Sequence, residues 1–419
     1  MKIDTIDTAK LDKVAQVMES LAQHQKSRSQ VQGGAMYYDL IADYFRNVQR
    51  AREEGKCLVA HTIFVPTEFL FAMDIVPVYL EGVCEIMARV HGMEESFSAA
   101  KSLGFATEIC SAHRLINATA IRGWLPRPDA FVWSNLVCDL TTKAGDFLVK
   151  LYDRPGYYLD RPYTDNEQGM QYYIKELGDL IHFLENLTGR RMDWDRLSEI
   201  MEYTRQSVEL FREIGDLRKA VPSPMRNQHV IEMCLAELLL SGSPEMVKFF
   251  RSIRDEVKTA AERGEGVIPK ERYRLLTFFF YPAHLWKLLD GIQNEYGAVI
   301  VTEPHLTLWA DADIDPSRPL ESLARKAFAL TDAGPLKPFL DKVLREAREY
   351  KADGAIYWAH VGCRQTCATT RIIKDTLMEQ LGIPTLIIDC DICDPTYAPG
   401  ERIKDKVEQF FEMLDERKD

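Results

Sequence analysis

The sequence predicts an α/β protein with two doubly wound domains, each built on a four-stranded parallel sheet. Short apolar segments that end in turn residues alternate with amphipathic segments in two separate parts of the 419-residue chain. The stretch between these parts is almost wholly helical in pattern. We therefore expect four regions: a helical N-terminal segment (1–48), a first α/β domain (49–165), a helical connecting region (166–263) and a second α/β domain (264–419).

In the N-terminal segment, an apolar stripe from Tyr37 to Phe45 predicts a helix that packs on the rest of the protein. The first domain then alternates the two patterns. Its expected strands are 57–63, 75–80, 128–134 and 157–159, and its expected helices are 67–73, 111–122 and 141–152. Ser111 is suited to cap the second of these helices.

The connecting region contains four amphipathic runs with few glycines. We expect helices over 170–187, 193–214, 227–240 and 244–262. The strand pattern resumes at 275–281, followed by Pro282, a helix over 285–293 and a strand over 298–302. This order of strand, aromatic–x–Pro, helix and strand also occurs over 58–80, which suggests that the two halves share one plan.

The most informative segment runs from Gly354 to Tyr397. Its pattern predicts a strand over 355–360, a helix over 364–381 and a strand over 385–389, which together form one βαβ unit with parallel strands. One pair of cysteines follows each strand; the four are Cys363, Cys367, Cys390 and Cys393. Because parallel strands end at the same edge, both pairs should face the crevice in which open sheets bind ligands.

Four thiols in such a crevice admit several interpretations. Buried core cysteines are one, although these thiols fall in turns rather than within strands or on helix faces. A disulfide would need an oxidising compartment, which nothing in the sequence suggests. Zinc accepts four thiolates, and iron–sulfur clusters are also held by thiolates. A helix beginning just after Cys363 favours a negatively charged cluster.

Two further cysteines of the first domain bear on this choice. Cys110 and Cys138 each lie in a loop before a helix, at the corresponding edge of the first sheet. If the domains face each other, six thiols meet in one cleft. A single zinc ion would leave thiols over, whereas three thiolates for each of two iron–sulfur cubes would use them all. Cys234 is expected in the core, while Cys57 or Cys84 could substitute as a ligand.

Weaker candidates are polar residues close to these cysteines or to a strand end. His360, Arg364 and Gln365 flank Cys363, where they could donate hydrogen bonds to sulfide or protons to a substrate; a buried turn network is the alternative. Glu68 lies in the first turn of a helix, where a carboxylate also interacts favourably with the helix dipole. His61 and His113 are as easily explained as satisfied core groups.

Composition excludes several function classes. A net charge of −12 argues against nucleic acid as a partner, and no apolar run reaches membrane-spanning length. The N-terminus lacks an apolar signal core, so we expect a cytoplasmic protein. The sequence contains neither the phosphate-binding motif GxxxxGK[ST] nor a GxGxxG motif after a strand. The chain should therefore not bind ATP or NAD through either motif.

Four motifs together resemble the 2-hydroxyacyl-CoA dehydratase and benzoyl-CoA reductase family. They are VPTEFLFAMDIVPVYL (residues 65–80), Cys138–Asp139, HVGCRQT (residues 360–366) and GIPTLIIDCDICDP (residues 382–395). The resemblance covers most of the chain. It implies two Rossmann-like domains, an iron–sulfur cluster bound by cysteines from both, and electrons supplied by a separate iron–sulfur ATPase. By this resemblance the matching ligands are Cys110, Cys138 and Cys363.

The chain departs from the family pattern by adding Cys367, Cys390 and Cys393. A second trio of thiols resembles the double-cubane branch, in which two cubes share a bridging sulfide (8Fe-9S) and homodimers act as ATP-dependent reductases of small molecules. This departure makes a CoA-thioester substrate doubtful. Two other interpretations remain: a 4Fe-4S catalytic subunit of a dehydratase or benzoyl-CoA reductase, and a non-catalytic cluster carrier or maturation scaffold.

Overall fold

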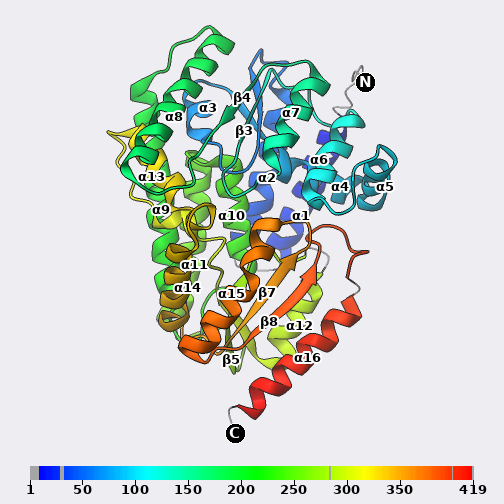
Figure 1. The fold of residues 1–419 in the computed structure, drawn as a ribbon, viewed down its shortest axis with the longest axis vertical. Helices are drawn as coiled ribbons and strands as arrows, with labels where there is room; N and C mark the ends of the chain where they lie inside the picture. The colour runs from blue at the N-terminus through cyan, green and yellow to red at the C-terminus, as the bar shows by residue number, and fades with distance from the viewer. Residues whose placement is uncertain (1–8, 29–32, 283–284, 399, 418–419) are drawn as a thin grey trace.

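In the computed structural model, which describes residues 9–28, 33–282, 285–398 and 400–417, two four-stranded sheets lie one above the other (Figure 1). The first sheet has the order β2-β1-β3-β4 and the second the order β6-β5-β7-β8. The strands are β1 (Leu58–His61), β2 (Val76–Tyr79), β3 (Ala130–Ser134), β4 (Gly156–Leu159), β5 (Tyr273–Phe278), β6 (Ala298–Thr302), β7 (Gly354–His360) and β8 (Thr385–Cys390).

All neighbouring strands are parallel, and the two sheets have the same topology. In each sheet the first strand lies between the second and the third, so the chain changes direction along the sheet at that point. Ligands of open parallel sheets bind at this switch point, outside the carboxyl ends of the strands. The prediction of two doubly wound, four-stranded parallel domains is therefore confirmed.

The helices cover the sheets and connect them. Those of the first part are α1 (Ala9–Arg28), α2 (Gly33–Arg50), α3 (Thr67–Ala72), α4 (Leu80–His91), α5 (Met93–Ser102), α6 (Ser111–Ile121) and α7 (Thr141–Tyr152). The connecting helices are α8 (Glu167–Thr188), α9 (Trp194–Arg218), α10 (Gln228–Leu240) and α11 (Pro244–Glu262). The second domain adds α12 (Trp286–Tyr296), α13 (Pro319–Ala329), α14 (Leu336–Glu349), α15 (Arg364–Leu381), α16 (Gly400–Glu416) and the 3₁₀ turns η2 (Leu308–Asp311) and η3 (Thr331–Ala333).

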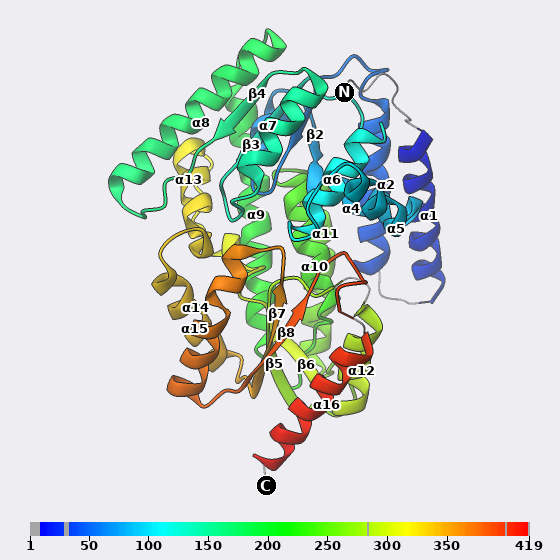
Figure 2. The same cartoon turned by 45° about the vertical axis from the view of Figure 1, so that its right-hand side comes forward.

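One apolar core joins the two domains. It extends from α1 and α2 through the first sheet and α8–α11 to the inner face of the second sheet, where it includes Phe278 and Tyr357. A separate cluster on the outer face of that sheet packs beneath α12 and α16 and includes Trp358 and Phe411. Figure 2 shows α1 and α2 against the first domain, beside α4 and α5. The shared core fixes the two sheets relative to each other.

The differences from the expected elements are local. Helices α4 and α5 fill residues 80–102, for which the sequence pattern predicted no element. The second strand passes directly into α4 without an intervening turn. The strand expected over 385–389 continues to Cys390, so this cysteine ends a strand rather than starting a turn. The helix expected over 285–293 is α12, which begins at Trp286 and continues to Tyr296.

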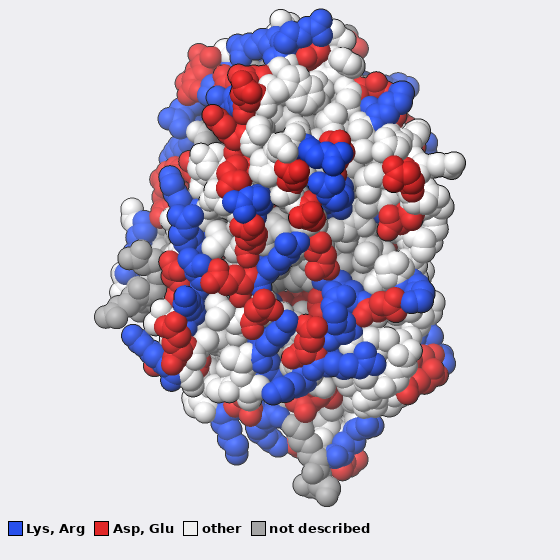
Figure 3. All heavy atoms as spheres, turned by 90° about the vertical axis from the view of Figure 1, so that its left-hand side faces the viewer, with Lys and Arg blue, Asp and Glu red and all other residues white. Residues whose placement is uncertain are grey.

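Charge is distributed evenly over the face that carries α9, α13 and α14. Basic and acidic side chains alternate there without a large field of one sign (Figure 3). This face therefore lacks the basic stripe that phosphate backbones require. Among the helices that the structure describes, none is both long and apolar enough to cross a bilayer.

Candidate functional site

The carboxyl ends of the two sheets face each other at one point of close backbone contact. Strand β7 ends at His360, and the turn that follows brings Gly362 against Cys110 of the first domain. A Cβ atom on Gly362 would lie 2.5 Å from Cys110 Cα, closer than any side chain allows. The absence of a side chain on Gly362 is thus what lets the two cysteine-bearing loops approach.

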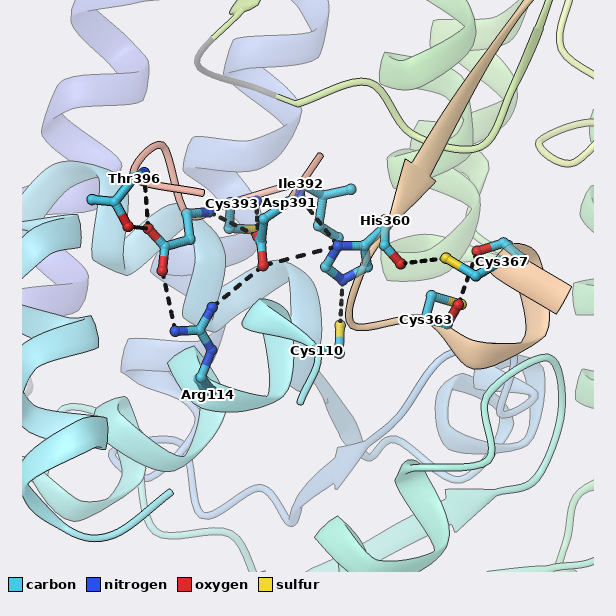
Figure 4. Close-up of polar contacts among 11 residues, drawn as sticks. Cys110, Arg114, His360, Cys363, Cys367, Asp391, Ile392, Cys393 and Thr396 are labelled. Carbon is cyan, nitrogen blue, oxygen red and sulfur yellow. Dashed lines mark hydrogen bonds and ion pairs between the residues drawn. The ribbon is translucent and has the colours of Figure 1, made fainter. Parts of the chain in front are cut away.

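A hydrogen bond joins the two domains directly at this contact. His360 Nε2 lies 3.3 Å from Cys110 Sγ (Figure 4). The backbone N–H of Ile392 donates to His360 Nδ1 at 3.4 Å. With Nδ1 used as an acceptor, Nε2 carries the proton and donates to the sulfur. Burial lowers the pKa of His360, which favours this neutral tautomer.

Three more thiols lie close to this pair. Cys110 and Cys363 each precede the first residue of a helix, α6 and α15 respectively. Cys367, one turn into α15, donates its S–H to the carbonyl of His360 at 3.1 Å. Cys138, in the turn between β3 and α7, has its sulfur 3.6 Å from Nε2 of His113. These helix starts favour a negative charge on the sulfurs.

The thiols are close enough to influence one another's ionisation. Burial first, and then the neighbouring thiols of Cys138 and Cys363, raise the pKa of Cys110. Burial raises the pKa of Cys138 to about 12, with a contribution from Cys363. Burial and Cys363 likewise raise the pKa of Cys367. Without a bound cation, the thiols of Cys110, Cys138 and Cys367 therefore stay protonated at neutral pH.

The last two cysteines extend the group on the β8 side. Burial has the largest effect in raising the pKa of Cys393, followed by the charges of Glu85 and Cys110. Cys393 therefore lies close enough to Cys110 of the first domain to interact with it electrostatically. Cys390 packs in the outer apolar core, and Cys367 is the thiol that contributes to raising its pKa. Cys393 and Cys390 thus lie within electrostatic range of Cys110 and Cys367 respectively, with Cys390 at the margin of the set.

A buried ion-pair network that the sequence motifs did not identify holds this region together. Arg114 donates to Asp391 Oδ2 at 3.3 Å and to Asp394 Oδ2 at 3.1 Å, joining α6 to the loop after β8 (Figure 4). Asp391 Oδ1 accepts the backbone N–H groups of Cys393 and Asp394, each at 2.9 Å. The signal available in the sequence was Arg114 one helical turn after Cys110.

The other predicted polar residues of the cysteine turn contact neighbouring elements, and one of them bridges the domains. The exposed Arg364 side chain pairs with Asp139, which follows Cys138. Gln365 donates to the backbone carbonyl of Asp332 in η3. Both side chains are therefore engaged in contacts with other elements beside the thiols rather than with the sulfurs themselves.

Glu68 lies in a different buried cluster. It accepts hydrogen bonds from Thr204, Ser241 and Lys326, at 3.1, 2.9 and 3.0 Å. None of its hydrogen bonds to the residues that the structure describes involves a cysteine. The structure also buries His61, which stacks on Tyr79.

A buried carboxyl group that the sequence did not single out lies closer to the thiols. Glu81, at the start of α4, accepts the backbone N–H of Ile63 at 3.3 Å. Burial raises its pKa to about 7, and its charge contributes to raising the pKa of Cys138. This group can therefore exchange a proton near neutral pH beside the cysteine site.

The remaining three cysteines lie outside the set. Cys57 precedes β1 and so lies at the opposite edge of the first sheet, where Asp129 contributes to its raised pKa. Cys84 and Cys234 are buried in the shared core. The placement of Cys234 agrees with the expectation that it is a core residue.

The donor chemistry fits a cluster better than a single ion. Within the described residues, no group of three Cys, His, Asp or Glu side chains has the geometry that holds one metal ion. A tetrahedral zinc site requires its sulfurs about 2.3 Å from one point, whereas a cluster binds each thiolate at a different iron atom. Six soft thiols on two domains, two of them buried and four partly buried, suit the second case.

These features define a two-domain α/β protein with a thiol-lined site between the carboxyl edges of two parallel sheets. The model of the family "2-hydroxyglutaryl-CoA dehydratase, D-component" matches residues 62–414, and the chain belongs to this family. It is 22% identical to a benzoyl-CoA reductase subunit of Thauera aromatica, over 91% of this chain and 94% of that protein. It is 23% identical to the (R)-2-hydroxyisocaproyl-CoA dehydratase alpha subunit of Clostridioides difficile, over 91% and 95%.

A third relative, the alpha subunit of lactoyl-CoA dehydratase of Anaerotignum propionicum, is 22% identical over 90% of this chain and 95% of its own. The resemblance inferred from the motifs is thereby confirmed at the level of the family. These similarities show that the chain is a subunit of the catalytic dehydratase or reductase type.

Proposed function

We propose that the protein is a cytoplasmic, homodimeric iron–sulfur reductase of small molecules that carries a double-cubane 8Fe-9S cluster. Its electrons would come from a separate iron–sulfur ATPase, whose ATP hydrolysis drives them to low potential. The observation that supports the proposal is that six cysteines lie in or beside the loops where the two domains meet, three more than a single cube with an open iron needs.

The proposed ligands are Cys110, Cys138 and Cys363 together with Cys367, Cys390 and Cys393. Once bound, the cluster would supply low-potential electrons. Binding would also remove the protons of the five thiols whose pKa burial raises, because metal coordination reverses that increase. The pKa values raised by burial and by neighbouring thiols mean that this loss of protons should accompany assembly.

The surrounding side chains have proposed roles in proton supply and orientation. His360 donates its Nε2–H to Cys110, and such hydrogen bonds to a ligand sulfur tune reduction potential. Arg364 and Gln365 hold the cysteine turn against the first domain and η3. Glu68 would act at the substrate rather than at the sulfurs, since it lies in the cluster of Lys326 and Ser241.

A second candidate function is a 4Fe-4S catalytic subunit of a 2-hydroxyacyl-CoA dehydratase or benzoyl-CoA reductase. The relatives' names favour it, since they are subunits of enzymes acting on CoA thioesters. The position of Cys390 in the outer core also favours it. A cluster carrier without turnover is the third interpretation.

The iron and sulfide content of anaerobically purified protein tests these alternatives. The double-cubane proposal predicts about eight irons per chain, and the single-cube alternative about four. Replacement of Cys393 by Ser should remove about half of the iron in the first case and leave it unchanged in the second. Cys57→Ala, at the opposite sheet edge, is the matched control. Iron-free or zinc-loaded protein would contradict both.

Turnover separates an enzyme from a carrier. When it is supplied with a partner iron–sulfur ATPase, ATP and a strong reductant, the enzyme should reduce small substrates catalytically. A carrier should instead transfer its cluster to an apo-protein and show no turnover. Retention of a CoA thioester during purification would favour the dehydratase alternative.

A further inference from the structure

A small cavity lies between the loop after β1 and helices α3, α8, α10 and α13. Its volume is about 30 Å³. Most of its wall is apolar and includes Phe64, Leu238, Trp309 and Leu323. One part is polar and is formed by Glu68, Glu237, Ser241 and Lys326. The cavity therefore combines an apolar wall with one polar end, the usual design of a small-molecule site.

The ammonium group of Lys326 is fully used within the polar end. It donates to Glu68 Oε1 at 3.0 Å and to Ser241 Oγ at 2.6 Å, and it pairs with Glu237 Oε1 at 2.5 Å. Burial opposes charge on both Lys326 and Glu68. The two carboxylates nevertheless raise the pKa of Lys326, and Lys326 lowers that of Glu68. The polar end thus holds one ammonium between two carboxyl groups, with no N–H left for a ligand.

Two polar atoms of the residues lining this cavity are buried without a partner. Glu68 is 0% exposed, and its Oε2 has no hydrogen-bond partner among the described residues. Trp309 is 1% exposed, and its indole Nε1–H also lacks one within the described chain. Buried polar groups are normally hydrogen-bonded. Both residues line the cavity, so one group within it that can both donate and accept would satisfy the two atoms.

Charge and hydrogen bonding limit the class of that group. A carboxylate or phosphate would be repelled by two carboxyl groups and would leave Glu68 Oε2 without a donor. An ammonium could donate to Glu68 but could not accept from Trp309, so it would leave the indole N–H without a partner. A purely apolar molecule would satisfy neither atom. A neutral hydroxyl group donates to Glu68 and accepts from Trp309, so it satisfies both.

The cavity also lies close to the cysteine site. Its wall includes Leu330, which directly precedes η3, and the side-chain amide of Gln365 donates to Asp332 within η3. Gln365 follows Cys363 by two positions. The cavity wall and the cysteine turn are therefore connected through η3.

We propose that this cavity binds the hydroxyl end of a small, neutral substrate, with Glu68 Oε2 as acceptor and Trp309 Nε1–H as donor. Describing the ligand as a substrate rests on the proposed function; the binding site itself does not. A volume of about 30 Å³ holds about two water-sized groups. The bound end is accordingly the hydroxyl and the carbon that carries it, as in a short alcohol.

Saturation-transfer NMR with the full-length, anaerobically purified protein tests the proposal. The probes are ethanol, acetate and ethylammonium, which are similar in size and differ in charge. Ethanol should receive saturation and the two ions should not. Transfer to no probe, or stronger transfer to either ion, would overturn the proposal, and so would a crystal structure in ethanol that shows only water in the cavity.

Two variants locate the binding. Trp309→Phe keeps an aromatic ring but removes the N–H, and it should weaken ethanol binding roughly fivefold, the effect of one hydrogen bond. Glu68→Gln should also weaken it. Trp194→Phe is the matched control, because Trp194 is exposed on α9. Folding is checked by circular dichroism, and unchanged binding in both cavity variants would refute the assignment.

Iron analysis of the same samples separates this proposal from the proposed function. Iron-loaded protein that does not bind ethanol would overturn the cavity assignment alone. Iron-free protein that binds ethanol at this site would overturn the reductase proposal alone.

Discussion

Two ion pairs connect the same two domains beside the cysteines, and they differ in exposure. Arg114 and Asp391 have side chains that are 6% and 2% exposed. Arg364 and Asp139 have side chains that are 84% and 52% exposed. In each pair one residue comes from each domain. Both pairs therefore join the two domains, but one is shielded from water and the other is exposed to it.

The comparison shows which pair determines the geometry of the site. The effective dielectric constant around a buried pair is low, so loss of one partner leaves an uncompensated charge that costs several kcal/mol. An exposed pair is screened by water and typically contributes about 0–1 kcal/mol. Asp391 also orients the backbone of Cys393. We infer that the Arg114 network positions the thiols, whereas the Arg364 pair contributes little to their placement.

The largest expected effect comes from breaking the buried network. Arg114→Ala should lower the free energy of unfolding by about 3–5 kcal/mol, because the buried Asp391 and the half-buried Asp394 then lose their cation. Urea unfolding followed by circular dichroism measures this change. Iron content should fall as well, since the loop that carries Cys393 loses its anchor.

A triple variant tests the reason for that loss. Arg114→Met combined with Asp391→Asn and Asp394→Asn removes both signs of charge, and it should recover part of the stability. The amide that replaces the Asp391 carboxylate would retain an oxygen that can accept the N–H of Cys393. If the triple variant is less stable than Arg114→Ala alone, uncompensated charge is not the cause.

A second buried charge, that of His229, makes the contribution of a buried ion pair to stability depend on pH. His229 Nδ1 lies 2.8 Å from Glu232, and its Nε2 lies 3.5 Å from Glu256. Burial opposes protonation, but the two carboxylates raise the pKa of His229 to about 9. A raised pKa stabilises the protein below the unfolded value near 6.5, and this contribution is lost as pH rises through 9.

The free energy of unfolding should therefore fall between about pH 6.5 and 9.5, by roughly 3 kcal/mol from this group. Urea unfolding at several pH values measures the slope. His229→Gln should flatten it, because glutamine does not titrate. The same slope in the variant and in the wild type would assign the pH dependence to other groups.

The backbone contact between the domains should show an intermediate effect. Gly362→Ala places a methyl group 2.5 Å from Cys110 Cα, so one of the two cysteine loops must move. We expect a loss of about 1–3 kcal/mol and a reduced iron content. Gly178→Ala is the control, since an added Cβ there meets nothing within 4 Å. Full iron loading of Gly362→Ala would mean that the loops can separate without harm.

The sequence predicted the sheets well because buried parallel strands produce short apolar runs between turn residues. Strand β6 and helices α7, α11 and α15 have the predicted boundaries. Helices α4 and α5 went unpredicted because α4 continues β2 without a turn. The sequence pattern predicted the contact between the Cys110 and Cys363 loops, which the structure shows at Gly362; the six-thiol ligand set stays a prediction. Spacing could not reveal the pairing of Arg114 with Asp391, which are far apart in sequence.

The smallest expected effect is that of the exposed pair. Arg364→Ala should change the free energy of unfolding by less than about 1 kcal/mol, because water screens both charges. Wild type and variant should become indistinguishable in about 1 M salt, where the Debye length is about 3 Å. A loss as large as that of Arg114→Ala would show that the exposed pair also sets the domain spacing. A negligible loss would leave the exposed arginine beside Cys363 free for a role in contacting an electron donor rather than in folding.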